Sequence, residues 1–587
     1  MNIGETAYMI PTSAKEIQKL GWEYVDIIIF SGDAYIDHPS FGTAVIARVL
    51  QSHGYRVAVV PQPNWQDDLR DFRKLGKPRL FFGVTAGAMD SMVNHYTAAR
   101  RLRSDDSYTP DGKAGRRPDY AVSVYSGILK KLFPDVPVVI GGIEASLRRF
   151  AHYDYWADKL FPSVLLSSGA DILVYGMGER QIVEIAKAYA MGNSPFEIPQ
   201  IAFLKRDFAL VEDDNTVVLH SYEKALNDKK LFVKNFDVIE TQANKLHPKR
   251  IVEPYREGYV VVNPPFPPST TKQMDEIYAL PFTKLPAPRY KDKVIPAFDM
   301  IKNSITIHRG CFGGCNFCTI AAHQGKFIQS RSMESIVSEV EKLVEMPFFK
   351  GVISDIGAPT ANMYTMGGKE KSLCAKCSRK SCLFPKRCPN LDHSHSNVLE
   401  LYKRISNVKG VKHSFVGSGI RYDLFLDENG FLDETSYPYF KEVVTKHTSG
   451  WFKVAPEHTE DCVLKLMAKP PFALFSRLRQ EFDRLVSQEK LKYKIVPYFI
   501  SSHPGCRLSD MVALSKNKDL KGISLEQVQD FTPTPMTASS AMFYSQMDTK
   551  GEKAVFVEKD IIAKKKQKSL FYAGNKGKRT YRRGKSQ

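Results

Sequence analysis

The sequence lacks any long apolar run and any recognisable secretory signal. Across its 587 residues no stretch of about eighteen consecutive apolar residues occurs, so no membrane-spanning helix is predicted. The start, Met1 to Glu5, has no basic region followed by an apolar one, so we expect a cytoplasmic protein. Nine cysteines in such a protein argue against a disulfide framework and indicate metal binding or catalysis.

Acidic residues are missing from the last part of the chain. Residues 561–587 contain ten Lys or Arg and no Asp or Glu, which is about half of the net charge of +19. A basic tail of this kind is typical of proteins that contact RNA. The simpler interpretation, which we favour, is a solvated and disordered tail without an apolar period.

Three cysteines lie together in a glycine-rich stretch, Arg309-Gly-Cys311-Phe-Gly-Gly-Cys315-Asn-Phe-Cys318. A short strand is predicted before it, at 303–308, and a helix after it, at 333–346, so the stretch is a crossover loop. Its glycines let the backbone fold tightly enough for three thiolates to converge. Three thiolates suit a [4Fe–4S] cluster with one iron open to a small molecule. The alternative is a zinc site with His308 or His323 as the fourth ligand.

Residues 1–200 are predicted to form a doubly wound α/β domain. Apolar runs of strand length alternate with helical patterns, which indicates a parallel sheet with right-handed crossovers. The runs are 25–30, 56–60, 80–84, 136–140 and 172–175. Ligands of such sheets bind at the carboxyl ends of the strands, where polar loops such as Gly141-Gly-Ile-Glu-Ala-Ser146 follow.

Residues 201–290 are predicted to be a connecting region, because Pro264-Pro-Phe-Pro-Pro268 and Pro286-Ala-Pro288 mark extended linkers. Residues 291–535 contain six strand–helix units, which predict a partial (β/α)6 barrel of the TIM type. The predicted strands are 305–308, 351–356, 413–417, 451–455, 493–500 and 527–531. Residues 536–587 are a C-terminal extension that includes the basic tail.

A second group of cysteines interrupts the predicted barrel at residues 365–396. The group is Cys374, Cys377, Cys382 and Cys388. The segment is basic and has few large apolar residues, so we predict that it folds around one metal. Zinc and a second [4Fe–4S] cluster both accept four thiolates, and the spacing does not choose between them. Of the remaining cysteines, Cys462 is expected in the core and Cys506 at a strand end.

The cysteine spacing of the glycine-rich loop resembles that of radical S-adenosylmethionine (radical-SAM) enzymes. The resemblance implies that Cys311, Cys315 and Cys318 hold a catalytic [4Fe–4S] cluster whose open iron binds S-adenosylmethionine (SAM). One electron then cleaves a carbon–sulfur bond of SAM to give methionine and a 5′-deoxyadenosyl radical. The electron is expected from an external donor such as flavodoxin or ferredoxin.

The same resemblance implies further contacts to the cofactor. Phe317, beside the last cysteine, is expected near the adenine, and Gly357 near the amino group of SAM. Arg421 suits the SAM carboxylate, and its alternative is a structural ion pair with Asp423 or Asp427. The complete set of cofactor candidates is Phe317, Gly357, Ser418, Arg421 and Glu457.

Motifs along nearly the whole chain resemble the YgiQ family of radical-SAM proteins. They include Asp37-His-Pro-Ser-Phe-Gly42, Gly141-Gly-Ile-Glu-Ala-Ser146, Ala358-Pro-Thr-Ala-Asn-Met-Tyr364 and Val454-Ala-Pro-Glu-His458. This resemblance implies the fold, the cluster and SAM, but it brings no substrate.

The first domain also looks like the cobalamin-binding-type domain that precedes many radical-SAM cores. In that domain a DxHxxG signature supplies a histidine to cobalt. Here Asp37 adjoins His38, and three residues separate His38 from Gly42. The spacing disfavours cobalt ligation by His38, and a Rossmann-like domain without cobalamin is preferred.

We therefore predict a radical-SAM enzyme that abstracts hydrogen from an unknown substrate. The second hypothesis is an RNA methylthiotransferase-like enzyme, drawn from the first domain, the extra cysteines and the basic tail. The third is a non-enzymatic nucleic-acid-binding protein with structural metals, which is disfavoured because an open iron serves no purpose in a pure binder. Cleavage of SAM separates the enzymes from the third hypothesis, and steep salt dependence of RNA binding would support the second.

Overall fold

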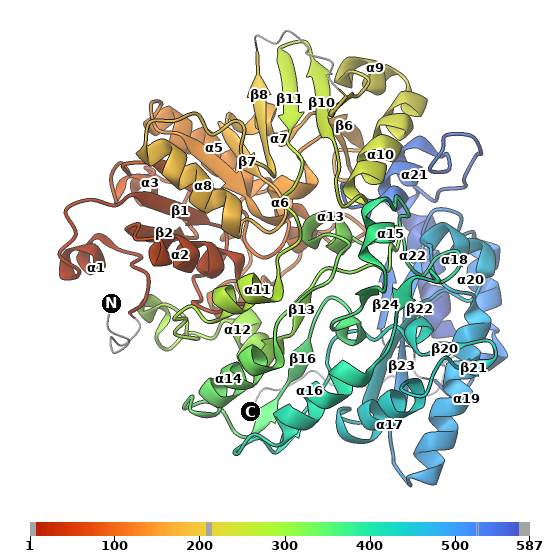
Figure 1. Ribbon diagram of the computed structural model, residues 1–587. Helices are drawn as coiled ribbons and strands as arrows, with labels where there is room; N and C mark the ends of the chain where they lie inside the picture. Colours follow the sequence, from red (N-terminus) through yellow and green to blue (C-terminus); the bar gives the residue numbers. More distant parts are fainter. Residues whose placement is uncertain (1–7, 207–213, 524, 526, 574–587) are drawn as a thin grey trace.

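The computed structural model describes residues 8–206, 214–523, 525 and 527–573. Two sets of parallel strands organise it, one in the first half of the chain and one in the second (Figure 1). The first set belongs to a nine-stranded sheet with the order β2-β1-β3-β4-β7-β8-β11-β10-β9. Among the described residues, no helix is long and apolar enough to cross a membrane.

Five parallel strands form the doubly wound part of the first sheet, as predicted. They are β1 (Ile27–Ser31), β2 (Val57–Pro61), β3 (Phe81–Thr85), β4 (Val138–Gly141) and β7 (Ile172–Val174). Helices α2 (Gly42–Ser52) and α8 (Glu179–Ala190) cover one face, and α5 (Ala121–Leu132) and α7 (Val164–Ser168) cover the other. Two hydrophobic cores therefore lie on the two sides of the sheet, which explains why these strands are apolar at nearly every position.

Residues 201–290 differ from the predicted connecting region, because they extend the first sheet. The added strands are β8 (Ile201–Lys205), β9 (Thr216–Val218), β10 (Arg250–Tyr255) and β11 (Gly258–Val262). Strands β8, β11 and β10 pair in antiparallel fashion, and β9 pairs parallel to β10. Alternation with helices, the pattern that reveals parallel strands, is absent from an antiparallel extension. Of these four strands, only the stretch 259–262 is predicted from the sequence.

The second set of strands lies between residues 304 and 530. Its members are β12 (Ser304–Thr306), β15 (Val352–Ile353), β16 (Asp355–Gly357), β19 (His413–Ser414), β22 (Trp451–Glu457), β23 (Lys494–Ser501) and β24 (Gln527–Asp530). They pair in parallel and in chain order, and a bridge between Ile420 and Val454 links the two halves. Between them run α14 (Met333–Val344), α16 (Ser396–Ser406), α17 (Ser436–Lys446) and α19 (Phe472–Gln488). We call residues 304–530 the second αβ unit.

The expectation of a disordered basic tail is wrong for residues 561–573. They form helix α22 (Ile561–Ala573), which packs on β24 and on α20 (Leu508–Ser515) (Figure 1). Phe571 is buried in the core of the second αβ unit, 6.0 Å from the ring of Phe499. Lys564 is also buried, because its stem lies against rings and its ammonium finds two oxygen acceptors. Residues 574–587 lie outside the described part.

We predict that Phe571→Ala lowers the free energy of unfolding by about 3 kcal/mol, because it empties a filled core position. Ile562→Ala on the same helix should change it by less than about 0.5 kcal/mol, since Ile562 is 76% exposed. Urea titrations of the two variants measure the difference. Equal effects would contradict the packing of α22 into the core.

Candidate active site

The cysteine loop begins at β13 (His308–Arg309) and ends at α13 (Ile320–Gln324). Strand β13 pairs with β14 (Gln329–Ser330), which brings the chain back over the start of the loop. Gly310 has φ +86°, and a Cβ there would lie 2.3 Å from the carbonyl oxygen of Phe327. Only glycine fits this crossing, so the tight approach of the two segments requires Gly310.

The structure brings the thiols of Cys311, Cys315 and Cys318 together, each partly exposed. The Cys311 sulfur lies 3.5 Å from the hydroxyl of Thr360 and accepts a hydrogen bond from the Gly313 amide at 3.4 Å. The Cys315 sulfur accepts one from Nη1 of Arg421 at 3.2 Å. Polar hydrogens around sulfur favour thiolates.

The donor set suits a group larger than one metal ion. Among the described side chains, no three from His, Cys, Asp or Glu stand close enough to hold a single ion. A tetrahedral zinc site would need sulfurs about 3.8 Å apart, because Zn–S bonds are about 2.3 Å long. A four-iron cluster accepts each cysteine at a separate corner. A Cβ at Gly313 would lie 2.6 Å from Nη1 of Arg421 and 3.4 Å from the Cys311 sulfur, so glycine leaves room for the guanidinium beside the thiols.

Neither histidine offered as a fourth ligand turns toward the thiols. The Nε2 of His308 lies 3.0 Å from the carbonyl oxygen of Thr360. The Nδ1 of His323 lies 3.1 Å from the hydroxyl of Ser146, in the first domain. Burial lowers the pKa of each ring to about 4, so both are neutral at pH 7.

The thiols themselves are electrostatically disfavoured as anions before a metal binds. Burial raises the pKa of Cys311, and it raises the pKa of Cys318 to about 12, with the charge of Cys315 adding to both. The Arg421 guanidinium works in the opposite direction on Cys311. Loading of a metal group on these sulfurs would therefore release protons.

Arg421 forms the structural ion pair that was the alternative to a SAM contact. Its Nε donates to Oδ1 of Asp423 at 2.9 Å, and its Nη2 to Oδ2 at 2.5 Å. The charge of Arg421 holds the pKa of Asp423 below its ordinary value although burial raises it. With Nη1 on Cys315, the guanidinium links the cysteine loop to the end of β19.

Gly357 and Ser418 lie beside Asp355, which sequence reasoning did not select. The Asp355 carboxylate accepts hydrogen bonds from the amides of Gly417 and Ser418 at 2.7 and 2.9 Å, and from the Ser418 hydroxyl at 2.5 Å. A Cβ at Gly357 would lie 2.3 Å from this carboxylate. Burial nevertheless raises the pKa of Asp355. Asp355 could have been selected from the sequence, because it is an acidic residue at the start of the short strand that leads to Gly357.

Glu457 and Phe317 flank the loop on its other side. Glu457 has φ +71° at the end of β22, and its Oε1 lies 3.8 Å from Nζ of Lys469. Its charge contributes to the raised pKa of Cys318, so the two groups are close. The Phe317 ring packs edge-on against His503 at 6.3 Å and joins the hydrophobic core.

The cysteine-rich insert is attached to the cysteine loop, which the sequence did not indicate. Strands β17 (Gly367–Gly368) and β18 (Leu391–Asp392) close the insert, and Leu383 packs with Phe312. The Ser381 hydroxyl donates to the Gly313 carbonyl at 2.7 Å, and the Cys382 amide donates to the Phe312 carbonyl at 3.1 Å. The few apolar residues of the insert thus share a small core with the loop.

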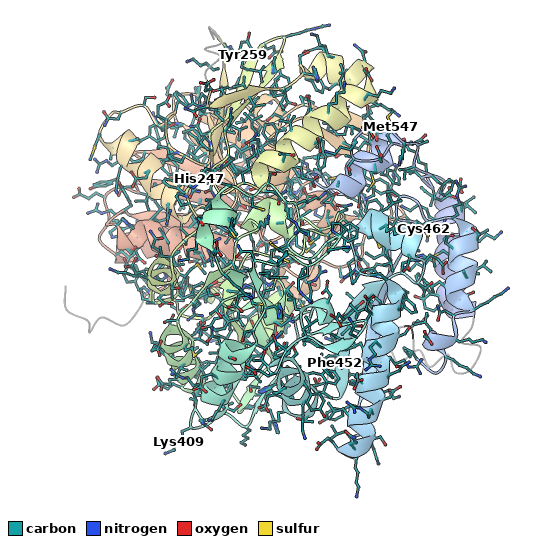
Figure 2. All side chains as sticks on the ribbon, turned by 45° about the vertical axis from the view of Figure 1, so that its right-hand side comes forward. His247, Tyr259, Lys409, Phe452, Cys462 and Met547 are labelled. Atoms are coloured by element: carbon teal, nitrogen blue, oxygen red, sulfur yellow. The ribbon has the colours of Figure 1, made fainter. Side chains whose placement is uncertain are left out.

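The four insert cysteines are partly exposed. Burial raises the pKa of Cys382, and the charges of the other three cysteines add to this rise. They therefore lie near one another. The expectation that Cys462 is a core residue is wrong: it lies exposed on α18 (Asp461–Met467) (Figure 2). Cys506 is buried, with its sulfur 3.5 Å from Nε2 of His458.

A cavity of about 490 Å³ separates the first sheet from the second αβ unit. Val174 and Phe81 of the sheet form its apolar part, and Asp355, Gly357 and Ser418 line the opposite wall. His38 is not among its lining residues. Its Nδ1 accepts a hydrogen bond from the Ser40 amide at 3.1 Å, and burial lowers its pKa to about 3. The ring is thus held within its own loop.

One buried ion pair connects the first domain to the cysteine loop. Nη1 of Arg309 donates to Oε1 of Glu179, at the start of α8, and its Nε donates to the Tyr278 hydroxyl. Both charged side chains are less than a tenth exposed. Sequence reasoning missed this pair, because nothing local connects Glu179 with a residue 130 positions along the chain.

The sequence is similar to one described protein family and to proteins of other organisms. Residues 9–304 match the family described as Radical SAM N-terminal. A UPF0313 protein of Bacteroides thetaiotaomicron is 51% identical over 579 residues, covering 96% of this chain and 93% of the relative. A UPF0313 protein of Porphyromonas gingivalis is 53% identical over 543 residues, covering 91% and 86%.

A solved structure was also similar. It is the radical S-adenosylmethionine methyltransferase TsrM from Kitasatospora setae with cobalamin and a [4Fe-4S] cluster bound. It aligns with a TM-score of 0.49 and 15% identity, over 88% of this chain and 73% of that one.

We predict that Glu179→Gln lowers the free energy of unfolding by about 3 kcal/mol, because it leaves the Arg309 charge buried and unpaired. Glu184→Gln on the same helix is the matched control, since its pair with Lys187 is half exposed, and should cost less than about 1 kcal/mol. Denaturant titration of both variants gives the comparison. Indistinguishable midpoints would show that the buried pair does not join the two parts.

Proposed function

Because this chain belongs to the UPF0313 family and is a radical-SAM enzyme, we propose that it cleaves SAM reductively and abstracts hydrogen from a substrate. The observation that carries the proposal is the convergence of the Cys311, Cys315 and Cys318 thiols on one glycine loop. When bound there, a [4Fe–4S] cluster supplies the electron that breaks a carbon–sulfur bond of SAM. The electron comes from an external donor, for which flavodoxin or ferredoxin is our proposal.

The residues around the loop would bind and orient. Nη1 of Arg421 donates to the Cys315 sulfur and thereby stabilises negative charge on that ligand. Since Asp423 occupies the other side of the guanidinium, this support for the thiolate is the role that the geometry favours for Arg421 over direct contact with the SAM carboxylate. Gly357, Ser418 and Glu457 remain proposed SAM contacts.

The cavity between the two parts is the proposed place of reaction. It lies against Gly357 and Ser418 on one side and against the first sheet on the other. Asp355 holds the Ser418 loop in place through its three hydrogen bonds. Cobalt ligation by His38 is not part of the proposal, because its Nδ1 accepts a hydrogen bond from the Ser40 amide and its spacing to Gly42 departs from the DxHxxG signature.

The RNA-modifying alternative loses part of its support. It relied on a free basic tail, but Lys564 is buried, with its ammonium bonded to the Tyr155 hydroxyl and the Phe531 carbonyl. Contact of residues 574–587 with RNA stays a prediction.

The insert is proposed to hold a second metal centre on Cys374, Cys377, Cys382 and Cys388. The electrostatic influence of the other three thiols on Cys382 supports one centre. No three of the described thiols stand close enough to hold a single ion, so binding of zinc or of a second [4Fe–4S] cluster would draw the four sulfurs together. Its hydrogen bonds to Phe312 and Gly313 give this centre a supporting role for the catalytic loop.

We predict that the triple variant Cys311→Ala, Cys315→Ala, Cys318→Ala forms no 5′-deoxyadenosine from SAM under reducing, anaerobic conditions. Cys462→Ala is the control and should retain both the cluster absorbance and the cleavage rate, because the Cys462 side chain is exposed on α18 and is not one of the proposed ligands. Chromatography of the product measures the outcome. Product formation by the triple variant at the wild-type rate would refute the assignment.

For the insert, we predict that Cys374→Ala with Cys377→Ala removes a single metal centre and opens residues 367–395 to protease. Because Ser381 and Cys382 hold the Phe312–Gly313 backbone, the catalytic cluster should also be lost faster on exposure to chelator. Metal analysis, limited proteolysis and the decay of cluster absorbance test this. Unchanged metal content would show that these cysteines hold no centre.

A further inference from the structure

One buried arginine of the first domain has no acidic partner. Arg149 is 4% exposed, its Nη1 donates to the Ser146 carbonyl at 2.6 Å, and its Nε has no hydrogen-bond partner. No carboxylate within the described part of the chain forms an ion pair with it. Burial lowers the pKa of Arg149 to about 10. Burial of a charge without a counter-charge is among the costliest arrangements in a protein.

Every other buried arginine of the described residues is paired with a carboxylate. These are Arg48 with Asp37, Arg117 with Asp33 and Asp106, Arg148 with Asp90, Arg309 with Glu179, Arg331 with Glu339, and Arg421 with Asp423. Arg148, the preceding residue in the chain, is thus buried with a carboxylate partner, whereas Arg149 is buried without one. The unpaired guanidinium is a feature of this one position.

Arg149 lines a cavity of about 610 Å³, and a second unpaired cation lines it too. Lys326 is 4% exposed, and its ammonium donates to the Arg379 carbonyl but pairs with no carboxylate of the described chain. Three glutamates also line this cavity, but each already pairs with another cation: Glu179 with Arg309, Glu184 with Lys187 and Glu276 with Lys272. The buried charges of Arg149 and Lys326 are therefore left without a carboxylate, which indicates that an anion completes the site.

The remainder of the cavity wall has both polar and apolar parts. Phe266 and Phe327 form an apolar part together with the prolines around Phe266, and Tyr175 lies under the Arg149 guanidinium at 4.7 Å. A concave site with apolar surface and fixed polar groups is typical of a site for a small organic molecule. Arg149 would bind the negatively charged group of that molecule, and the aromatic rings would contact its apolar part.

This cavity adjoins the 490 Å³ cavity between the two parts. Gly176, Glu179 and His323 line both. His323 lies on α13, the helix that follows Cys318, and its ring contacts the hydroxyl of Ser146, whose carbonyl accepts from Arg149. A ligand anchored at Arg149 would therefore extend along α13 toward the catalytic loop.

We propose that the 610 Å³ cavity is a binding site for an organic anion, whose carboxylate or phosphate pairs with Arg149 and Lys326. Guanidinium binds either oxyanion in bidentate fashion, so the shared chemistry is an oxyanion on a partly apolar body. The assignment of this anion as the substrate rests on the radical chemistry proposed above, whereas its binding does not require that chemistry.

The test measures anion binding in the reconstituted full-length protein without reductant or SAM. Thermal unfolding is followed in increasing inorganic phosphate, and separately in benzoate, each at ionic strength matched with sodium chloride. A midpoint that rises with phosphate alone indicates a phosphorylated ligand, and one that rises with benzoate alone indicates a carboxylate. A midpoint that rises with neither anion overturns the proposal.

The Arg149→Met variant should lose the response and, without anion, should be at least as stable as the wild type, because it removes an uncompensated charge. The matched variant Arg148→Met should be less stable, because it leaves Asp90 buried and unpaired. If Arg149→Met does not fold, Arg149→Lys is the second variant, because lysine keeps the positive charge but cannot donate two parallel hydrogen bonds to one oxyanion. Its half-saturating anion concentration should rise on the order of tenfold. An unchanged anion response in the folded Arg149 variants contradicts the site.

Failure of this proposal and failure of the radical chemistry give different results. Loss of SAM cleavage in the wild type, with anion binding intact, rejects the proposed function and leaves the anion site. Normal SAM cleavage without any anion response rejects the site alone.

Discussion

The cysteine loop cannot fold on its own, because it must gather three thiols in a segment made largely of glycine and cysteine. Four separate parts of the chain hold it. The Phe327 carbonyl crosses over Gly310, the insert binds the Phe312 and Gly313 carbonyls, and the Ser539 amide, at the start of α21 (Ala538–Ser545), donates to the Asn316 carbonyl at 2.9 Å. The fourth support is the Arg309–Glu179 pair from the first domain. Loop geometry therefore depends on the assembly of the whole molecule.

Buried ion pairs are the recurrent means by which this chain joins distant segments. Arg309 and Glu179 connect the two parts, and Lys284 with Arg331 shares Glu339 across the junction between them. The two cations hold the pKa of Glu339 down at about 2. Replacement of either partner leaves a buried charge, so such pairs define a unique arrangement more than they add stability. Against this background the unpaired Arg149 stands apart.

Much of the framework could be predicted from the sequence, because parallel strands buried on both faces are continuous apolar runs between helices. Each of the five strands expected in the first domain and the six expected after residue 304 has a counterpart in the structure. Strands β8 to β10 were missed because antiparallel strands lack that alternation. Candidate ligands such as Cys311 can be selected from the sequence, because they belong to a local motif. The ion pair between Glu179 and Arg309 cannot be, because its partners are 130 residues apart.

Helix α22 shows why charge composition alone misled. Its lysines indicated a solvated segment, but a helix presents different residues on different sides, and Phe571, Gln567 and Lys564 all face inward. Gln567 accepts from the amide and the hydroxyl of Ser502, at the end of β23. Lys564 reaches Tyr155 of the first domain and Phe531 after β24, and burial lowers its pKa to about 8. The helix thus joins the first domain to the second αβ unit independently of the Arg309–Glu179 pair, so the two parts are held at two separate places and the cavity between them has a defined shape.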